Sequence, residues 1–340
     1  MRTITAGVLG AGRIGRIHAD NLLRMDGVRL KTIADPYVDF EGWPPPGVAT
    51  SPDPAAVLED NEIEAILVCS PTPSHADFAE AAARAGKHVF CEKPIALDAD
   101  RVRATLGIVQ TAGVKLQVGF NRRFDPTFSR ARQAVVDGEV GDVYLVRVTA
   151  RDPALPPAGY VKGSGGMFAD MTIHDFDMVR YLSGCEIEEV HAYGAVLVDP
   201  AIGEAGDIDT AVLSLRLSNG GLAFIENSRQ AVFGYDQRVE VLGSKGAIEA
   251  DNETPARARL STGAGVRYEN PLYFFLERYQ RSFFVELEAF FASIRDDREP
   301  PVGGKDGLIA LLVCQAANRS LLENRPVRVE PLGPPALKRA

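Results

Sequence analysis

The sequence lacks long apolar runs, clustered cysteines and an excess of positive charge. None of its apolar stretches approaches the ~18 residues of a membrane-spanning helix, and the first residues lack the apolar stretch and cleavage site of a signal peptide. Its four cysteines show no metal-ligand spacing, which favours a reduced, cytoplasmic compartment. Lys and Arg total 37 against 46 Asp and Glu, so an acidic surface argues against nucleic-acid or membrane-surface partners.

The 340 residues are 46% hydrophobic and 24% charged, which indicates two soluble globular domains. The first third alternates short apolar runs with amphipathic segments, predicting an α/β Rossmann domain with a doubly wound parallel sheet. Beyond about residue 125, β-type runs separated by turn signals predict an α+β domain with a large, mainly antiparallel open sheet. We expect the first domain over 1–121 and the second over 122–340, whose final helix can pack back on the first domain.

The apolar patterns also predict the individual elements. Strands are expected at 4–9, 30–34, 65–69, 89–91, 116–119, 143–150, 188–197, 210–217, 222–230, 238–242 and 247–250. Helices are expected at 13–25, 75–85, 100–111, 126–137, 171–182, 284–295 and 307–323. Segments 41–54 and 151–166, rich in Pro or Gly, are expected as loops, and the tail over 331–340 as a frayed end.

A glycine motif stands between the first expected strand and the first expected helix. In Gly10-Ala-Gly12-Arg-Ile-Gly15, the first glycine allows a tight turn, the second lets the backbone approach a pyrophosphate, and the third allows close helix packing. Asp35 follows about 20 residues later at the end of the second strand, where a carboxylate holds the ribose hydroxyls. Because Asp35 would repel a 2′-phosphate, the pattern predicts NAD rather than NADP.

The segment Cys91-Glu92-Lys93-Pro94 follows another apolar strand. Ligands of open α/β sheets bind beyond the carboxyl ends of the strands, which places Lys93 at the mouth of a cleft. A compact cation there can bind a substrate hydroxyl and stabilise an alkoxide. A surface lysine in a turn fits the spacing equally well. His75 starts a helix and can line the nicotinamide side of that cleft.

Asp170 and His174 form the third candidate. If their segment is helical, the two side chains lie four residues apart on one face. A carboxylate beside an imidazole fixes its tautomer and stabilises the imidazolium, which suits a general base. The spacing fits equally well with Asp170 as a helix cap and His174 as a core residue. Because no third ligand is evident nearby, we expect no metal site.

Together these motifs resemble the glucose-fructose oxidoreductase / inositol dehydrogenase / rhizopine catabolism family over nearly the whole chain. Within that family, three segments resemble the inositol 2-dehydrogenase branch. They are Gly119-Phe-Asn-Arg-Arg-Phe-Asp125, the segment from Gly165 to Asp177, and the segment from Gly234 to Gly246.

The resemblance implies roles for particular residues. The implied catalytic residues are Lys93, Asp170 and His174. The implied cofactor-binding residues are Gly10, Gly12, Arg13, Ile14, Gly15, Asp35, Ser70, Thr72, His75, Glu92 and Lys93. The implied substrate contacts are Lys93, Arg122, Asp152, Asp170, His174, Asp177 and Tyr235. Some members carry Asn at the position of Asp152, which leaves the identity of the polyol open.

The expected function is NAD-dependent oxidation of a ring secondary alcohol, with myo-inositol giving 2-keto-inositol. Another inositol isomer (scyllo or chiro) or an aldopyranose is an alternative substrate. A non-catalytic sensor of NAD and sugar, or a glycosidase with an NAD redox cycle, is an alternative function on the same fold. We also expect a homotetramer that associates through the open sheet of the second domain.

Overall fold

The computed structural model describes residues 2–332, so the expected frayed tail lies mostly outside the described residues. Contacts divide the chain into two units. The first comprises residues up to Asn121 together with Arg281–Leu311, and the second comprises Arg122–Gln280 with Leu312–Pro331. Residues 281–311 thus group with the first unit, whereas we expected them, apart from the final helix that can pack back, in the second domain. Across residues 2–332, no helix has both the length and the apolar character needed to cross a bilayer.

The first unit is built on a six-stranded sheet in the order β3-β2-β1-β4-β5-β6, and every neighbouring pair is parallel. This confirms the predicted doubly wound sheet. The strands are β1 (Ile4–Leu9), β2 (Val28–Ala34), β3 (Ala49–Ser51), β4 (Ala65–Val68), β5 (His88–Cys91) and β6 (Leu116–Val118). The expectation of a loop over 41–54 is wrong at β3, a short and largely exposed strand without the apolar run that marks the others.

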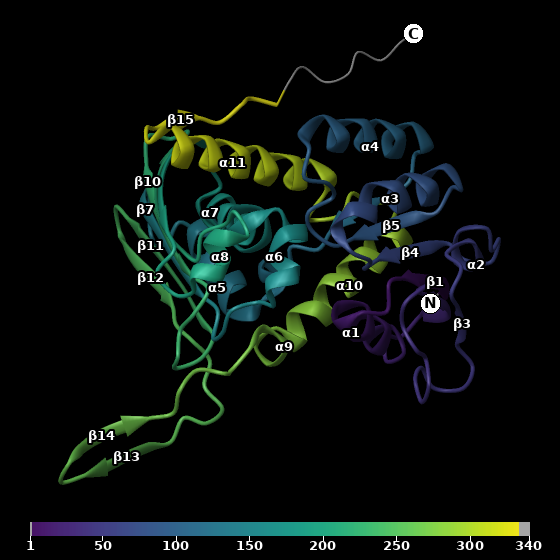
Figure 1. Ribbon diagram of the computed structural model, residues 1–340, viewed down its shortest axis with the longest axis horizontal. Helices are drawn as coiled ribbons and strands as arrows, with labels where there is room; N and C mark the ends of the chain where they lie inside the picture. Colours follow the sequence, from purple (N-terminus) through teal and green to yellow (C-terminus); the bar gives the residue numbers. More distant parts are fainter. Residues whose placement is uncertain (1, 333–340) are drawn as a thin grey trace. The chain divides into compact units, whose positions relative to one another are not determined.

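Helices from both ends of the sequence complete this unit (Figure 1). Its helices are α1 (Arg13–Leu22), α2 (Ala55–Leu58), η1 (Thr72–Ser74), α3 (His75–Arg84), α4 (Ala99–Ala112), most of α10 (Gln280–Arg295) and the start of α11 (Gly304–Glu323). Phe290 and Phe291 of α10 belong to the same buried apolar cluster as Ile4 and Val8 of β1. The first strand of the parallel sheet therefore shares its core with a helix from the far end of the sequence.

The second unit contains a seven-stranded sheet in the order β12-β11-β7-β10-β9-β8-β15. Only β7 and β10 pair in parallel among its described strands, which confirms the mainly antiparallel prediction. The strands are β7 (Val143–Arg151), β8 (Ile187–Ala195), β9 (Thr210–Leu217), β10 (Leu222–Ser228), β11 (Asp236–Gly243), β12 (Gly246–Ala250) and β15 (Val327–Arg328).

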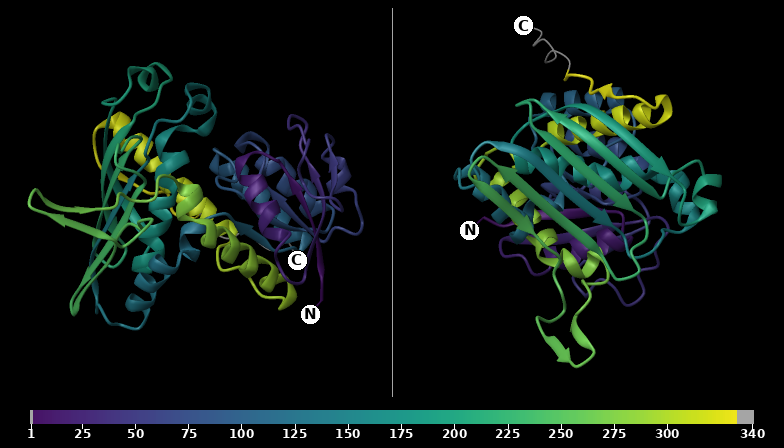
Figure 2. Two further views of the ribbon diagram at one scale, coloured as in Figure 1. Left: turned by 90° about the horizontal axis from the view of Figure 1, so that it is seen from below. Right: turned by 90° about the vertical axis from the view of Figure 1, so that its left-hand side faces the viewer.

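Side chains on these strands alternate between two faces. Along β9, Ala211, Leu213, Leu215 and Leu217 are buried and the residues between them are exposed or half-buried. The buried face packs against helices that include α5 (Pro126–Val136) and α7 (Ile173–Ser183). The right-hand view of Figure 2 looks onto the opposite face, with the helices of this unit behind the strands.

Several short elements of the second unit escaped sequence prediction. The expected loop over 151–166 contains the helix α6 (Ala158–Ser164), which ends at Gly165 in a left-handed conformation. A π-helical turn, η3 (Phe168–Thr172), follows directly. The remaining missed elements are η2 (Asn121–Phe124), α8 (Pro200–Glu204), β13 (Arg259–Thr262), β14 (Gly265–Tyr268), α9 (Phe275–Arg278) and the short strand β15. The β13–β14 hairpin is exposed throughout, so its sequence lacks the alternation of a half-buried strand.

Candidate active site

The glycine turn after β1 has the geometry that its motif predicts. Gly10 adopts a φ of 97°, and an added Cβ there would lie 2.5 Å from the backbone N of Ser70. An added Cβ on Gly15 would lie 2.0 Å from the carbonyl oxygen of Gly10, so α1 approaches the turn only because this residue is glycine. Gly12 faces open space instead, with no atom within 4 Å of an added Cβ. The turn is therefore packed against the protein at Gly10 and Gly15 and open at Gly12, where a pyrophosphate could approach the backbone.

The start of α1 suits an anion. Its N-cap Gly12 supplies no side chain to cap the helix, and the first turn contains no acidic residue. Backbone N–H groups at a helix N-terminus are ready donors for phosphate oxygens. Arg13 is exposed at this end, whereas Ile14 is half-buried and packs against the core. These residues fit the pyrophosphate of a dinucleotide.

Asp35 lies at the end of β2, against the glycine turn. One of its oxygens accepts a hydrogen bond from the backbone N–H of Ala11 at 2.7 Å, and the other accepts from Tyr37 at 2.8 Å. The side chain is thus fixed in place by two backbone donors. A fixed carboxylate beside the turn is the group that holds the ribose hydroxyls of NAD.

The loops after β4 and β5 are joined by His75. Its Nδ1 lies 2.8 Å from the carbonyl oxygen of Pro94, and its Nε2 lies 2.6 Å from that of Ser70. Because the ring is only 2% exposed, His75 braces the two loops from within. Thr72 and Lys93, one on each loop, are half-buried. The role of His75 as a lining residue stays a prediction.

The second unit holds Asp170 in a cluster of polar side chains. One Asp170 oxygen accepts a hydrogen bond from the Tyr160 hydroxyl at 2.8 Å, and the other lies 3.2 Å from Nη1 of Arg229. Arg229 is 1% exposed and reaches Asp207 with its second terminal nitrogen at 3.1 Å. Asp207 in turn accepts the backbone N–H of Met167. A buried guanidinium thus fixes the Asp170 carboxylate.

The backbone around Asp170 and His174 differs from the single α-helix that we expected. Asp170 lies in the wider π-helical turn η3, whereas His174 lies in the first turn of α7. The spacing of a regular α-helix therefore does not describe this pair. His174 itself is half-buried rather than a core residue.

Asp152 follows β7 and shares the electrostatic surroundings of Asp170. Burial raises its pKa to about 6, and the negative charge of Asp170 adds to this, while Arg229 and Arg122 oppose it. Desolvation and the Asp170 carboxylate likewise raise the pKa of Tyr160, so its hydroxyl stays a hydrogen-bond donor. The cluster therefore combines a phenol donor, a fixed carboxylate and a carboxyl group that titrates near neutral pH.

The other expected substrate contacts lie in the interior of the second unit. Arg122 pairs with Asp175 at 2.5 Å, with both side chains buried. Asp177 is 1% exposed and accepts hydrogen bonds from Arg123 on both oxygens. Tyr235 is buried and packs edge-on against Tyr279. The structure assigns Arg122 and Asp177 to buried ion pairs, and their contacts with a polyol stay predictions.

Sequence reasoning missed the partners of Asp170. Tyr160 lies in a segment that we interpreted as a loop, and Asp207 follows the unpredicted helix α8. Arg229 fell within the expected strand over 222–230. An arginine near the end of an alternating strand was the available signal, but its partners come from other elements and no local pattern identifies them.

Comparisons with known proteins cover both units. The family described as "Oxidoreductase family, NAD-binding Rossmann fold" matches residues 4–120, and that described as "GFO/IDH/MocA C-terminal domain" matches residues 128–249. The chain is 49% identical to the myo-inositol 2-dehydrogenase of Thermotoga maritima, across 95% of this chain and 98% of that protein. It is 46% identical to an inositol 2-dehydrogenase of Rhizobium meliloti, across 96% and 99%.

A solved structure agrees with these relatives. The scyllo-inositol dehydrogenase of Lactobacillus casei, determined with NAD(H) and scyllo-inositol, is 31% identical and matches with a TM-score of 0.88. The match covers 96% of this chain and 99% of that chain.

Two glycine variants separate the two roles of the turn. Gly15→Ala should destabilise the protein without any ligand by about 1–3 kcal/mol or more, because its Cβ meets the Gly10 carbonyl. Gly12→Ala should keep the stability of the free protein within about 0.5 kcal/mol and weaken NAD binding by at least about tenfold. Denaturant unfolding and calorimetric titration with NAD measure the two effects. Equal loss of stability in both variants would contradict the assignment.

Asp35 is predicted to set the cofactor preference. Wild-type protein should use NAD better than NADP, and Asp35→Ser should reduce that preference by about tenfold, because the charge that repels a 2′-phosphate is removed. Asp39→Ser is the matched control, since Asp39 is an exposed carboxylate in the same loop. The measurement is kcat/KM with each cofactor. A wild-type preference for NADP would show that Asp35 has been assigned wrongly.

Proposed function

The chain belongs to the GFO/IDH/MocA oxidoreductase family, and we propose that it oxidises a ring hydroxyl of inositol with NAD as the hydride acceptor. The substrate that we favour is myo-inositol, oxidised to 2-keto-inositol. One observation carries the proposal. The glycine turn and Lys93 lie in the segment that matches the family's Rossmann domain, and Asp170 and His174 lie in the segment that matches its C-terminal domain. The sensor and glycosidase alternatives have no feature of the described residues in their favour.

The proposed mechanism assigns one task to each side chain. Bound NAD supplies the acceptor for the hydride that leaves the carbinol carbon. Lys93 binds the reacting oxygen and stabilises the negative charge that develops on it. His174 accepts the hydroxyl proton, so the carbon loses a hydride and the oxygen loses a proton as the ketone forms.

Asp170 acts in this scheme through its fixed position. The Tyr160 hydroxyl contacts one of its oxygens and the Arg229 guanidinium contacts the other. A carboxylate held in this way has little freedom to turn, so it can orient a neighbouring imidazole or a substrate hydroxyl. Asp152, which titrates near pH 6, is positioned by the same charges and suits hydrogen bonding to a second hydroxyl.

A substrate screen tests the proposed reaction. Purified protein with NAD should produce NADH from myo-inositol at a higher kcat/KM than from scyllo-inositol, chiro-inositol or aldopyranoses. A ranking led by another inositol isomer would correct the substrate and keep the chemistry. Failure to form NADH from any of these compounds, even at alkaline pH, would contradict the dehydrogenase assignment.

His174→Ala should lower turnover by about 100-fold or more, because general-base catalysis typically contributes ~10²–10⁴. NAD binding should stay intact, since the cofactor-type residues lie on the other unit. Asp170→Asn should lower turnover by a smaller factor than His174→Ala does. It should also move the acid limb of the pH–rate profile toward lower pH. His191→Ala, a histidine on β8, serves as the control. Full activity of His174→Ala would instead make Lys93 the favoured base.

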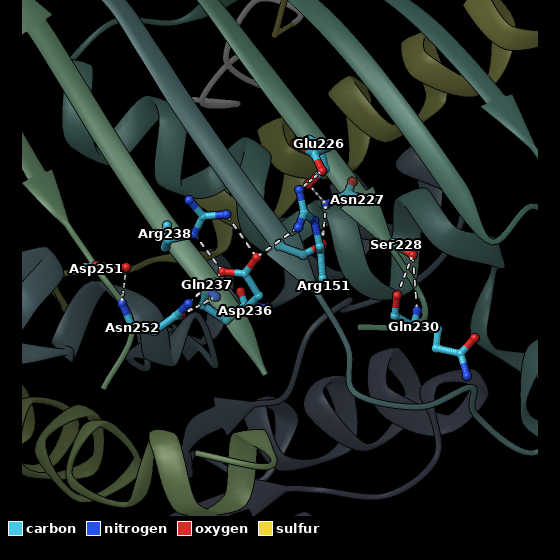
Figure 3. Close-up of polar contacts among 11 residues, drawn as sticks. Arg151, Glu226, Asn227, Ser228, Gln230, Asp236, Gln237, Arg238, Asp251 and Asn252 are labelled. Atoms are coloured by element: carbon cyan, nitrogen blue, oxygen red, sulfur yellow. Dashed lines mark hydrogen bonds and ion pairs between the residues drawn. The ribbon is translucent and has the colours of Figure 1, made fainter. Parts of the chain in front are cut away.

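We also infer a homotetramer formed through the open face of the second unit's sheet. Apolar side chains are exposed there on neighbouring strands, namely Tyr193, Val212, Leu222 and Leu242. Beside them, Arg151 pairs with Glu226 and Asp236, and Asp236 also accepts from Arg238 (Figure 3). A sheet face with self-paired charges and exposed apolar groups suits burial against another copy.

Light scattering tests this assembly. Wild-type protein should have the mass of a tetramer at micromolar concentration. Val212→Arg combined with Leu222→Arg should dissociate it, because both side chains point to the open face. Wild-type protein that is monomeric at this concentration would contradict the assembly. We further infer a cytoplasmic location, because all four cysteines are free thiols.

A further inference from the structure

A carboxyl group without a hydrogen-bond partner lies in the core of the first unit. Glu286 on α10 is 0% exposed, and among the described residues neither of its carboxyl oxygens has a hydrogen-bond partner. Its helix neighbours Leu287 and Phe290 belong to the apolar core. An ionised carboxylate without partners is one of the most costly groups to bury. Its presence there therefore requires an explanation.

Glu286 faces two polar residues from other elements. Nε2 of His18, on α1, lies 2.7 Å from Oε1 of Glu92, at hydrogen-bonding distance. One polar atom from each of Glu286, Glu92 and His18 lies within 4.8 Å of the others. His18 is fully buried, with its ring edge-on to Phe90. An added Cβ on Gly119 would lie 2.9 Å from a Glu92 oxygen, so the backbone of the next strand end confines that carboxylate.

The charges around Glu286 determine its protonation. Burial, followed by the negative charge of Glu92, raises the pKa of Glu286 well above its usual value. At the end of β4, burial likewise raises the pKa of the Cys69 thiol, which therefore adds no charge. From β6, the Gln117 side chain donates to the backbone carbonyl of Glu286 rather than to its carboxyl group. Glu92 and His18 are thus the neighbouring polar groups that bear on the protonation of Glu286.

We propose that Glu286 is a positioning residue that stays a neutral acid on the inner side of Glu92. The cluster then carries one negative charge, on Glu92, and the hydrogen bond from His18 fixes that side chain. Because Glu92 immediately precedes Lys93, fixing Glu92 also fixes the turn that presents the lysine. The effect on catalysis rests on the proposed function, whereas the protonation state does not.

A metal ion is the alternative occupant of such a cluster. Two ligands of one zinc ion, each about 2.1 Å from the metal, lie about 3.4 Å apart in tetrahedral geometry. His18 Nε2 and Glu92 Oε1 are closer than that, at a hydrogen-bonding distance of 2.7 Å. The geometry therefore favours a proton. Metal analysis of the purified protein provides the check, and one tightly bound ion per chain that Glu286→Gln removes would overturn the proposal.

The infrared difference spectrum between wild-type protein and Glu286→Gln tests the protonation state of Glu286 directly. Wild-type protein at neutral pH should show the carbonyl stretch of a protonated carboxylic acid, and Glu286→Gln should lack it. Glu288→Gln is the matched control, because Glu288 is exposed on the same helix two residues away. It should keep the band. A wild-type spectrum without this band, or a band unchanged by Glu286→Gln, would overturn the proposal.

The pH dependence of stability provides a second readout that needs no activity. A carboxyl group whose pKa is raised by folding stabilises the folded state at low pH and loses that contribution as pH rises toward its folded pKa. The melting temperature of wild-type protein should therefore fall, relative to that of Glu286→Gln, as pH rises above the ordinary pKa of a glutamate, about 4.3. Parallel curves for the two proteins would contradict a neutral Glu286.

Activity then tests the positioning role. Ionisation of Glu286 at alkaline pH would place two carboxylates within 4.8 Å of each other and disturb the Glu92–Lys93 turn. The ratio of kcat in Glu286→Gln to kcat in wild type should therefore rise with pH, whereas the ratio for Glu288→Gln should stay constant. A constant ratio for Glu286→Gln, beside a confirmed acid band, would reject the positioning role and leave the dehydrogenase assignment untouched.

Discussion

The pairing of buried charge is the constraint on which the functional parts of this protein depend. An ion removed from water must meet a partner or give up its charge. In the second unit, Arg229 meets this requirement by contacting Asp170 and Asp207, with almost no exposed surface of its own. The contact joins Asp170 to the residue that directly follows β10. The same requirement pairs Arg122 with Asp175 in the interior.

In the first unit, the buried carboxyl group of Glu286 has no hydrogen-bond partner among the described residues, while Glu92 lies at hydrogen-bonding distance from His18. The proposed neutral form of Glu286 meets the same constraint without an ion pair. In each unit, buried polar groups lie beside a segment that carries proposed catalytic residues. In the second unit these groups form ion pairs, and in the first they are the His18–Glu92 contact with the proposed neutral acid next to it. The parallel sheet supplies the frame, because the carboxyl ends of β1, β4 and β5 open on one edge.

The sequence predicted those features that depend on local patterns. The glycine turn, α1 and every strand of the parallel sheet except β3 were predicted, because tight turns and buried strands leave continuous signatures of glycine and apolar residues. Lys93, Asp170 and His174 were identified as candidates from their place in the expected elements and from the family resemblance, and their roles stay predictions. The π-helical turn at Asp170 was not, since no composition separates it from an ordinary helix.

Local sequence patterns could not predict contacts between segments that lie far apart in the chain. His18 belongs to no sequence motif. It packs against Phe90, and the residue that it contacts at hydrogen-bonding distance, Glu92, lies 74 residues away in the chain. In the sequence, nothing distinguishes Glu286 from the exposed acidic residues of an amphipathic helix. Only the packing of α10 against the parallel sheet shows that Glu286 is buried. Arg229 likewise becomes informative only when β10 lies beside η3.

Transfer of a labelled hydride tests the central claim most directly. The protein is incubated with NAD and myo-inositol deuterated at carbon 2, and the reduced nicotinamide is analysed by NMR and mass spectrometry. The account predicts one deuterium at carbon 4 of the NADH ring, together with a slower reaction than with unlabelled inositol. NADH without deuterium, or deuterated inositol that stays unconsumed under conditions where another compound reduces NAD, would contradict it.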